Sequence, residues 1–202
     1  MNAHDRAAIV IGGSAGALEA LGAILPALPA GFPLPIALVL HVPPTRSNHL
    51  TQVLGGRCAL DVVEANDKQP LEPGAIYVAP PDYHMLIERT RTVALSADDP
   101  VRFSRPSIDV LFESASDAYG PSLVGLLLAG ANDDGARGLA QIKASGGLTV
   151  VQSPGTSGAS VTRTMPESAL RLAPADHVLP LPEIGPFLAR LGEPGIPKKE
   201  TA

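Results

Sequence analysis

The sequence has little cysteine, few aromatic residues and no run of positive charge. Its single cysteine, Cys58, excludes an internal disulfide and any metal site built from several cysteines. Aromatic residues make up 3% of the chain and tryptophan is absent, so the core must be packed from Ala, Val, Leu and Ile. The formal net charge of −5, without a Lys/Arg run, argues against a nucleic-acid partner. We expect neither a metal nor a cofactor.

Uninterrupted apolar stretches of membrane-spanning length are also lacking. Between Ala7 and Leu40 the only charged residue is Glu19, yet a glycine turn and the prolines at 26, 29, 33 and 35 divide this region into pieces too short to cross a bilayer. MNAHDR leads directly into the first apolar segment, with no signal peptide. We therefore expect no membrane insertion and a cytoplasmic location.

What the chain does contain is an alternation of apolar runs and helical patterns. Strands without polar alternation, separated by helices, predict a mainly parallel sheet covered on both faces. The expected strands lie at 7–12, 35–42, 75–79, 123–129, 148–152 and 177–180. The expected helices lie at 17–28, 47–54, 107–118, 134–144, 165–172 and 182–191. Residues 85–97 break this rhythm and predict an antiparallel hairpin at the sheet edge. The pattern is that of a single doubly wound α/β domain over residues 1–192, followed by a flexible tail over 193–202.

A glycine-rich turn follows the first expected strand. The five residues from Gly12 to Gly16 read GGSAG and fit G-x-S-x-G, in which a tight turn projects a serine hydroxyl beyond the strand while the next helix points its free N–H groups at the same place. The alternative is a serine that only caps the helix. A dinucleotide-binding turn fits less well, because Ser14 replaces the second glycine and the second strand ends in His41 instead of an acidic residue.

Polar residues follow three of the expected strands at their carboxyl ends, where function collects in such sheets. They are Ser14, His41 and the pair Asp133/Asp134. Serine, histidine and aspartate are the components of a nucleophile, its base and the carboxylate that orients the base. Either aspartate could orient His41 while the other caps the following helix, and His41 could instead be a core histidine bonded to the backbone. An ordinary α/β-hydrolase would use His177, but its serine follows several strands, and Ser14 follows only one.

Motifs in a fixed order extend from Ile9 to Ile184. They are VIGGSAGALEAL, LVLHVPP, LEPGAIYVAPPDYHMLI, RPSIDVLFESA, VGLLLAGANDDGARGL, GGLTVVQ and TMPESAL ahead of HVLPLPEI. In these motifs the chain resembles the catalytic domain of the chemotaxis-type protein-glutamate methylesterases. The resemblance implies a serine hydrolase that removes methyl esters from glutamate side chains on the cytoplasmic helices of chemoreceptors, with some members deamidating glutamine. It implies Ser14 as nucleophile, His41 as base and Asp134 as the orienting acid.

The same resemblance suggests further site residues. Backbone N–H groups of Ala15 and Gly16, or of Ala131 and Asn132, would hold the oxyanion. His84 and Arg105 lie in matching motifs and are candidate substrate-site residues.

Some positions depart from the pattern of the family. Ala15 stands where relatives have threonine, and Ala131 where they have methionine. These departures keep open the alternative of a catalytically weakened relative that acts as a binding or regulatory module. Relatives also carry an N-terminal receiver domain, whereas here the first strand starts within ten residues of Met1, so we expect a stand-alone catalytic domain.

Overall fold

The strand that begins at Ala8 forms the centre of the sheet. In the computed structural model, which describes residues 6–41, 50–155 and 163–193, β1 (Ala8–Gly13) pairs in parallel with β2 (Ile36–Leu40) on one side and β7 (Leu123–Leu127) on the other. The seven strands run, in spatial order, β3 (Asp61–Glu64), β4 (Ala75–Val78), β2, β1, β7, β8 (Leu148–Gln152) and β9 (His177–Leu179). Every pairing among them is parallel. The predicted doubly wound parallel sheet is confirmed.

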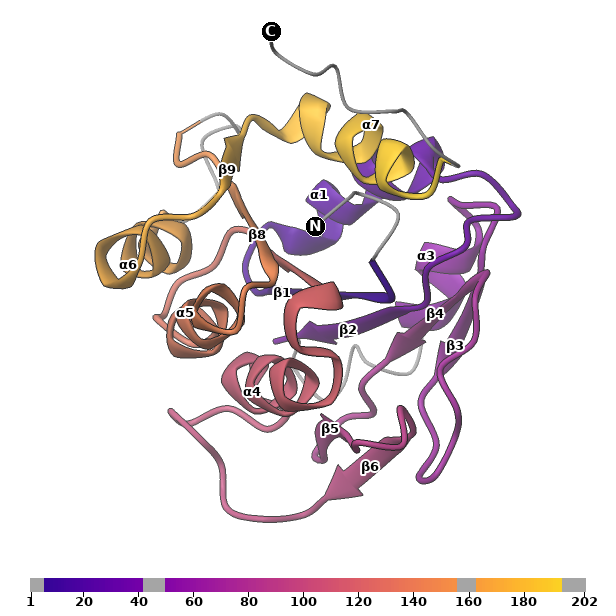
Figure 1. The fold of residues 1–202 in the computed structure, drawn as a ribbon, viewed down its shortest axis with the longest axis horizontal. Coiled ribbons are helices and arrows are strands. Elements are labelled where there is room, and N and C mark those ends of the chain that lie inside the picture. The colour runs from indigo at the N-terminus through magenta and orange to yellow at the C-terminus, as the bar shows by residue number, and fades with distance from the viewer. Residues whose placement is uncertain (1–5, 42–49, 156–162, 194–202) are drawn as a thin grey trace, which may run out of the picture.

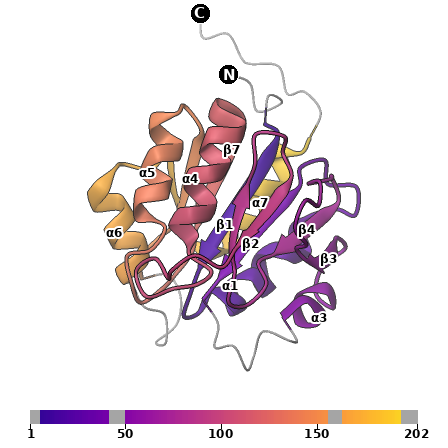
Figure 2. The same cartoon turned by 90° about the horizontal axis from the view of Figure 1, so that it is seen from below.

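Helices cover both faces of the sheet (Figure 1). One face carries α4 (Ile108–Tyr119), α5 (Ala136–Ala144) and α6 (Thr164–Leu172), and the other carries α1 (Ala17–Ile24), α3 (Leu50–Gly55) and α7 (Leu181–Leu191). Figure 2 shows α4, α5 and α6 standing side by side along the sheet.

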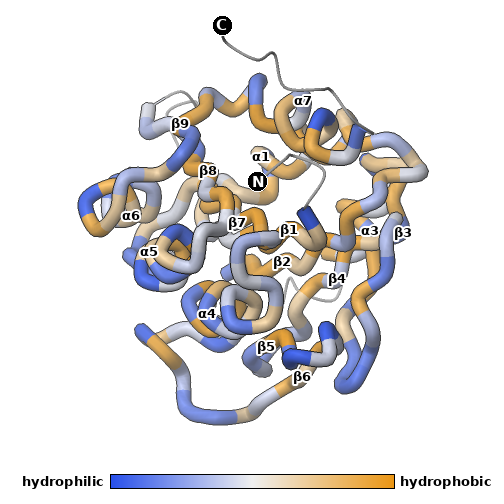
Figure 3. The backbone as a smooth tube through the Cα atoms, in the orientation of Figure 1, coloured by the Kyte–Doolittle hydropathy of each residue, from blue (hydrophilic) through white to orange (hydrophobic). Residues whose placement is uncertain are grey.

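The core divides into two layers because successive residues of a strand point to opposite faces. Ile9 and Ile11 of β1 are buried in the layer under α1 and α7, whereas Ala8 and Val10 are buried in the layer under α4. The central strands are accordingly mostly hydrophobic, whereas α4, α5 and α6 carry hydrophilic as well as hydrophobic residues (Figure 3). Both layers are packed mainly from aliphatic residues, as the shortage of aromatics requires.

An antiparallel pair of strands sits outside the main sheet. β5 (His84–Ile87) and β6 (Val93–Ser96) form a two-stranded sheet of their own in the region predicted as a hairpin. This pair lies against α4 (Figure 1), and the backbone N–H of Ile87 donates to the hydroxyl of Ser114 on that helix at 3.1 Å. After β6 the chain passes through the loop 97–107 to the start of α4.

Several elements differ in detail from the sequence pattern. The edge strand β3 was not predicted, because its four residues carry charges at both ends and are half exposed. The helix expected over 17–28 changes after Ile24 to a 3₁₀ turn, η2 (Leu25–Ala27), which Pro26 favours. Residues 47–49 of the expected third helix, and the tail after residue 193, lie outside the described residues. Among the helices that the structure describes, none is long and apolar enough to cross a membrane.

Close contact between β1 and α4 depends on Gly12. A Cβ atom placed on Gly12 would lie 2.2 Å from Cγ2 of Ile108, the first residue of α4. Because Ile108 is itself fully buried and β-branched, it has little freedom to move aside. The glycine thus lets the beginning of α4 approach the end of the central strand.

Replacing Gly12 with alanine should therefore destabilise the fold. We expect Gly12→Ala to lower the free energy of unfolding by about 1–3 kcal/mol, the usual cost of overpacking a filled core. Gly31→Ala is the matched control, since a Cβ there meets nothing within 4 Å, and it should change the value by less than about 0.5 kcal/mol. Urea unfolding of both variants measures the difference, and equal midpoints for the two would contradict this account.

Candidate active site

Ser14 follows β1 at the carboxyl end of the sheet. Its backbone N–H donates to the carbonyl of Ala129, which follows β7, at 2.9 Å. The turn closes through Gly16, whose φ of 83° lies in the left-handed region that glycine adopts without strain. Gly16 is the N-cap of α1, and no side chain caps that helix. The alternative of a serine that caps α1 is therefore excluded, and the half-buried Ser14 is left at the tip of the turn.

His41 stands beside Ser14 on the neighbouring strand. The register pairs Gly13 of β1 with Leu40 of β2, and the backbone N–H of His41 donates to the carbonyl of Gly13 at 3.1 Å. Adjacent parallel strands lie about 4.8 Å apart, so the residues that follow Gly13 and Leu40 are neighbours. The imidazole of His41 is 13% exposed, and its Nε2 lies 2.9 Å from Oδ2 of Asp134. The structure thus brings a histidine and an aspartate into contact across 93 residues of sequence.

The Asp134 carboxylate is fully buried, and both of its oxygens accept hydrogen bonds. Oδ2 accepts from His41 and from the backbone N–H of Ile108 at 2.7 Å. Oδ1 accepts from the hydroxyl of Ser107 at 2.9 Å and from the N–H of Asp109 at 3.0 Å. The two N–H groups belong to the first turn of α4, where the helix dipole favours an anion.

These donors decide the charge of Asp134. Burial by itself would raise the pKa of the carboxyl. The hydrogen bonds from His41 and from the N–H groups of Asp109 and Ile108 outweigh that effect, and the pKa lies below its ordinary value. Asp134 is therefore an ionised carboxylate at neutral pH and acts only as an acceptor.

An ionised Asp134 also determines which nitrogen of His41 carries the proton. Because the carboxylate can only accept, Nε2 of a neutral imidazole must be the protonated nitrogen that donates to it. Nδ1 is then the unprotonated nitrogen and can accept a proton from a neighbouring hydroxyl. This tautomer is the one that a general base next to Ser14 requires.

Asp133 and Asn132, which precede Asp134, point elsewhere. The Asp133 carboxylate is 52% exposed and pairs with Arg102. The N-cap of α5 is Gly135, and no side chain caps that helix, so the expectation that one of the two aspartates caps it is wrong. The side-chain oxygen of Asn132 accepts from the N–H of Asp134 at 3.3 Å, which turns the chain so that Asp134 faces inward.

Backbone N–H groups line the space beside Ser14. Within the described residues, the N–H groups of Ala15, Gly16 and Ala131 have no hydrogen-bond acceptor. Gly130 lies against the serine, since a Cβ built on it would come within 3.0 Å of the Ser14 Cβ. Both loops predicted to hold an oxyanion therefore stand next to Ser14 with free donors.

His84 is buried in a second layer and does not reach the surface. It is only 2% exposed, so a surface histidine is excluded. Its Nδ1 accepts from the backbone N–H of Ser107 at 3.2 Å, and its Nε2 bonds the carbonyl of Asp99 at 3.2 Å. Because Ser107 in turn bonds Asp134, His84 holds the start of α4 in place from behind the site.

Arg105 lies in the wall of a pocket beside His41. This pocket has a volume of about 430 Å³ and is lined by residues of β2, β4 and the loop before α4, among them Phe103 and Arg105. The guanidinium of Arg105 donates to Asp82 at 2.8 and 3.1 Å and to the carbonyls of Ala97 and Asp98. Since its donors are engaged by the protein, Arg105 shapes the pocket wall in this structure.

The sequence pattern did not identify several residues that surround the site. Ser107 is recognisable as the cap of α4, and its hydroxyl does accept from Val110, but nothing local indicates its bond to Asp134. Gln152 at the end of β8 accepts from the N–H of Ala129, and Met165 of α6 packs against Gly130. Polar Gln152 at the end of an apolar strand was an available signal, because a buried amide needs a partner.

The profile of the family described as CheB methylesterase matches residues 9–188. The chain belongs to the CheB methylesterase family. The crystal structure of the Thermotoga maritima CheB methylesterase catalytic domain superimposes with a TM-score of 0.86 at 32% identity, covering 92% of this chain and 98% of that one. The fold and the order of motifs are thus those of a CheB catalytic domain.

Curated relatives carry a consistent name. A protein of Anaeromyxobacter dehalogenans named protein-glutamate methylesterase/protein-glutamine glutaminase 5 is 43% identical, over 91% of this chain and 50% of its own length. A Leptospira interrogans protein that bears the same name provisionally is 45% identical, over 92% of this chain and 95% of its own length. Family membership makes this chain a carboxylic ester hydrolase by class.

The bonds to Asp134 predict its effect on stability. Asp134→Asn removes the charge and one acceptor oxygen, so a buried N–H or the Ser107 hydroxyl loses its partner, and we expect a loss of about 1–3 kcal/mol in the free energy of unfolding. Asp133→Asn, at a half-exposed carboxylate, should cost less than about 1 kcal/mol. Equal losses in the two variants, measured by urea unfolding at neutral pH, would refute the distinction.

The same carboxylate makes stability depend on pH. Because the pKa of Asp134 is lowered in the folded state, the ionised group stabilises the protein above the ordinary carboxyl pKa of about 3.9, and this contribution is lost as pH falls through the lowered value. The unfolding free energy of Asp134→Asn should therefore decline less in acid than that of the parent protein. If the unfolding free energies of the two proteins declined equally in acid, the lowered pKa of Asp134 would be contradicted.

Proposed function

We propose that this protein hydrolyses glutamate methyl esters on the cytoplasmic helices of a chemoreceptor-type protein, with Ser14, His41 and Asp134 as its catalytic residues. The observation that carries the proposal is the 2.9 Å pair of His41 and an ionised Asp134 beside the serine turn of a CheB-family chain. The relatives named protein-glutamate methylesterase/protein-glutamine glutaminase support this substrate class. A substrate on the cytoplasmic side requires a cytoplasmic enzyme, which fits the single cysteine.

In the first half of the reaction, Ser14 becomes acylated. Its oxygen attacks the carbonyl carbon of the ester while Nδ1 of His41 takes the hydroxyl proton. The imidazolium that forms is stabilised by the Asp134 carboxylate at Nε2. Collapse of the tetrahedral intermediate breaks the carbon–oxygen bond to the methoxy group, which leaves as methanol with the proton from His41. A glutamine side chain would release ammonia by the same steps.

The negative oxygen of the intermediate needs donors that are already in position. The N–H groups of Ala15, Gly16 and Ala131, which have no acceptor in the part of the chain that the structure describes, supply them from the two loops that flank Ser14. In the second half of the reaction, water attacks the acyl group with His41 again as base, and the glutamate carboxylate and Ser14 are regenerated. Backbone donors suffice for this role, so the alanines at 15 and 131 do not remove it.

The alternative of a catalytically weakened binding module is not favoured. It rests on the side chains lost at positions 15 and 131, whereas the charge, tautomer and burial of the His41–Asp134 pair are those that an active base needs.

Ser14→Ala tests the nucleophile. We expect loss of labelling by a fluorophosphonate probe and a fall of about 10⁴- to 10⁶-fold in hydrolysis, because no other group supplies the attacking oxygen. Ser122→Ala, at the opposite end of the sheet, is the control and should label like the parent protein. Labelling that persists in Ser14→Ala, read by intact mass, would identify a different nucleophile and overturn the proposal.

The pH profile tests the base. Hydrolysis of a small activated ester should fall as the pH is lowered, by up to about tenfold for each pH unit, since an imidazolium cannot accept the Ser14 proton. Asp134 remains ionised across that range because its pKa is lowered, so a single proton should account for the acid limb. A rate that stays constant down to about pH 5 would exclude histidine as the base.

A further inference from the structure

The loop that leads from β6 into α4 contains a tight hairpin at the rim of the pocket that His41 lines. Val101 and Ser104 exchange two backbone hydrogen bonds, at 3.1 and 2.9 Å, around Arg102 and Phe103. These two residues have φ values of 50° and 63°, a left-handed geometry that two-residue hairpins usually obtain from Asn-Gly or Gly-Gly. Arginine and phenylalanine adopt it only with strain, so contacts elsewhere must hold the turn.

Arg102 supplies those contacts. Its guanidinium pairs with the carboxylate of Asp133, and its Nε lies 3.3 Å from Oδ2 of Asp109. The Asp109 carboxylate is fully buried, and within the described residues its Oδ2 has no hydrogen bond. The cations next to this oxygen are Arg102 and, with its Nε 3.9 Å away, Arg137. The backbone N–H of Asp109 donates to Asp134. The hairpin is thus anchored to the same helix turn that holds the Asp134 carboxylate.

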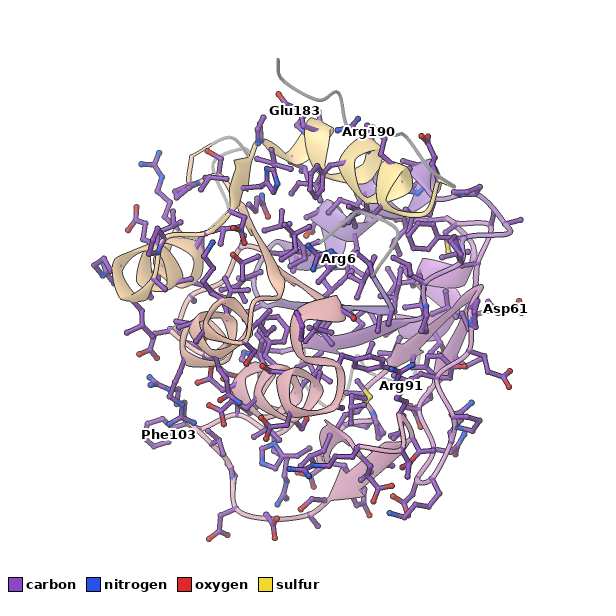
Figure 4. All side chains as sticks on the ribbon, viewed as in Figure 1. Arg6, Asp61, Arg91, Phe103, Glu183 and Arg190 are labelled. Carbon is purple, nitrogen blue, oxygen red and sulfur yellow. The ribbon has the colours of Figure 1, made fainter. Side chains whose placement is uncertain are left out.

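The anchored turn leaves Phe103 entirely in solvent. Its exposure is 103% of the reference value, and its side chain extends from the outer corner of the loop (Figure 4). The ring stands at the rim of the 430 Å³ pocket that also contains His41. A strained turn that holds an aromatic ring in water adds nothing to folding, because both features oppose it.

A second groove, of about 310 Å³, lies on the other side of the hairpin. Its walls include Arg102, Arg137 and Arg171. Arg102 is paired with Asp133, and Arg137 with Glu113 at 2.7 Å. Arg171 donates to the hydroxyl of Ser168 at 2.8 Å and pairs with no carboxylate among the described residues. The neighbouring Leu172 is 57% exposed. Among the described residues, the groove therefore offers a partner the unpaired cation of Arg171 next to the apolar side chain of Leu172.

We propose that Phe103 and Arg171 bind the protein substrate, an acidic α-helix that carries the methylated glutamate. The inference rests on the proposed function and adds the contacts that select the substrate. On a helix, residues three and four apart share one face, so a helix laid across the hairpin can present the ester to the pocket, an apolar side chain to Phe103 and a carboxylate to Arg171. Because the chain carries a net charge of −5, an acidic partner is not attracted at long range, and the local cation must select it.

The test uses synthetic helical peptides with one glutamate γ-methyl ester. One peptide carries glutamates on the face of the ester, and a second has glutamine at those positions. We expect Phe103→Ala to raise KM for both peptides by about tenfold and Phe103→Tyr to restore KM. Arg171→Glu should remove the preference for the acidic peptide, which we expect to be about tenfold in the parent protein.

Matched surface variants control for general effects. Val178→Ala removes another exposed apolar side chain on β9, and Arg190→Glu reverses a charge on α7, on the far side of the molecule from Phe103 (Figure 4). Both should keep the parent KM and the parent preference. If Phe103→Ala and Arg171→Glu also keep them, this inference is overturned and the proposed function stands. If the parent protein hydrolyses neither peptide, the proposed function fails and the inference fails with it.

Discussion

A buried carboxylate organises this end of the molecule. Asp134 has no contact with water, and it remains charged because the imidazole of His41, the Ser107 hydroxyl and two N–H groups of α4 all donate to it. Removing any one of these donors would leave charge in an apolar setting, which is costly. The start of α4, the loop before α5 and the end of β2 are therefore held relative to one another by a single side chain. The orientation of His41 and its tautomer follow from that arrangement.

The segment between β4 and α4 supports the site around Asp134. It leaves the main sheet to form the β5–β6 pair, and His84, at its first position, bonds the backbone of Ser107. The same segment then returns along the pocket, where Arg105 ties it to Asp82, before it enters α4. The β5–β6 pair lies outside the parallel sheet, yet it holds the helix turn that binds Asp134. The segment also builds the wall on which the substrate would lie.

Around Ser14 the chain relies on backbone in place of side chains. The N–H groups of Ala15 and Ala131 have no acceptor among the described residues, their side chains are small, and Gly130 approaches Ser14 closely. Electrostatic stabilisation by backbone dipoles depends on the conformation of the two loops more than on the residues that occupy them. The departures from the usual family residues at these positions are consistent with retained chemistry, and their effects would fall on the contacts made with the substrate.

Much of the architecture was contained in the local pattern of the sequence. Apolar runs without alternation predicted buried parallel strands, and the GGSAG turn and His41 followed two of these strands at their carboxyl ends. A sheet of this kind brings such ends together, so Ser14 and His41 could be expected to meet. Edge strand β3 escaped this reasoning because its pattern, half exposed and charged at both ends, does not differ from that of a loop.

The local pattern did not separate Asp133 from Asp134, since adjacent residues in a loop carry the same signal. The family resemblance pointed to Asp134, and the tertiary structure supplies the physical reason. The choice came from Asn132 turning the chain and from the helix N-terminus that receives the inward carboxylate. His84, Ser107 and Asp109 likewise gained their roles from contacts across 23 to 29 residues, which no local periodicity records. The exposure of Phe103 could not be predicted from the sequence for the same reason. Burial is a property of how elements pack, whereas sequence pattern determines which elements form.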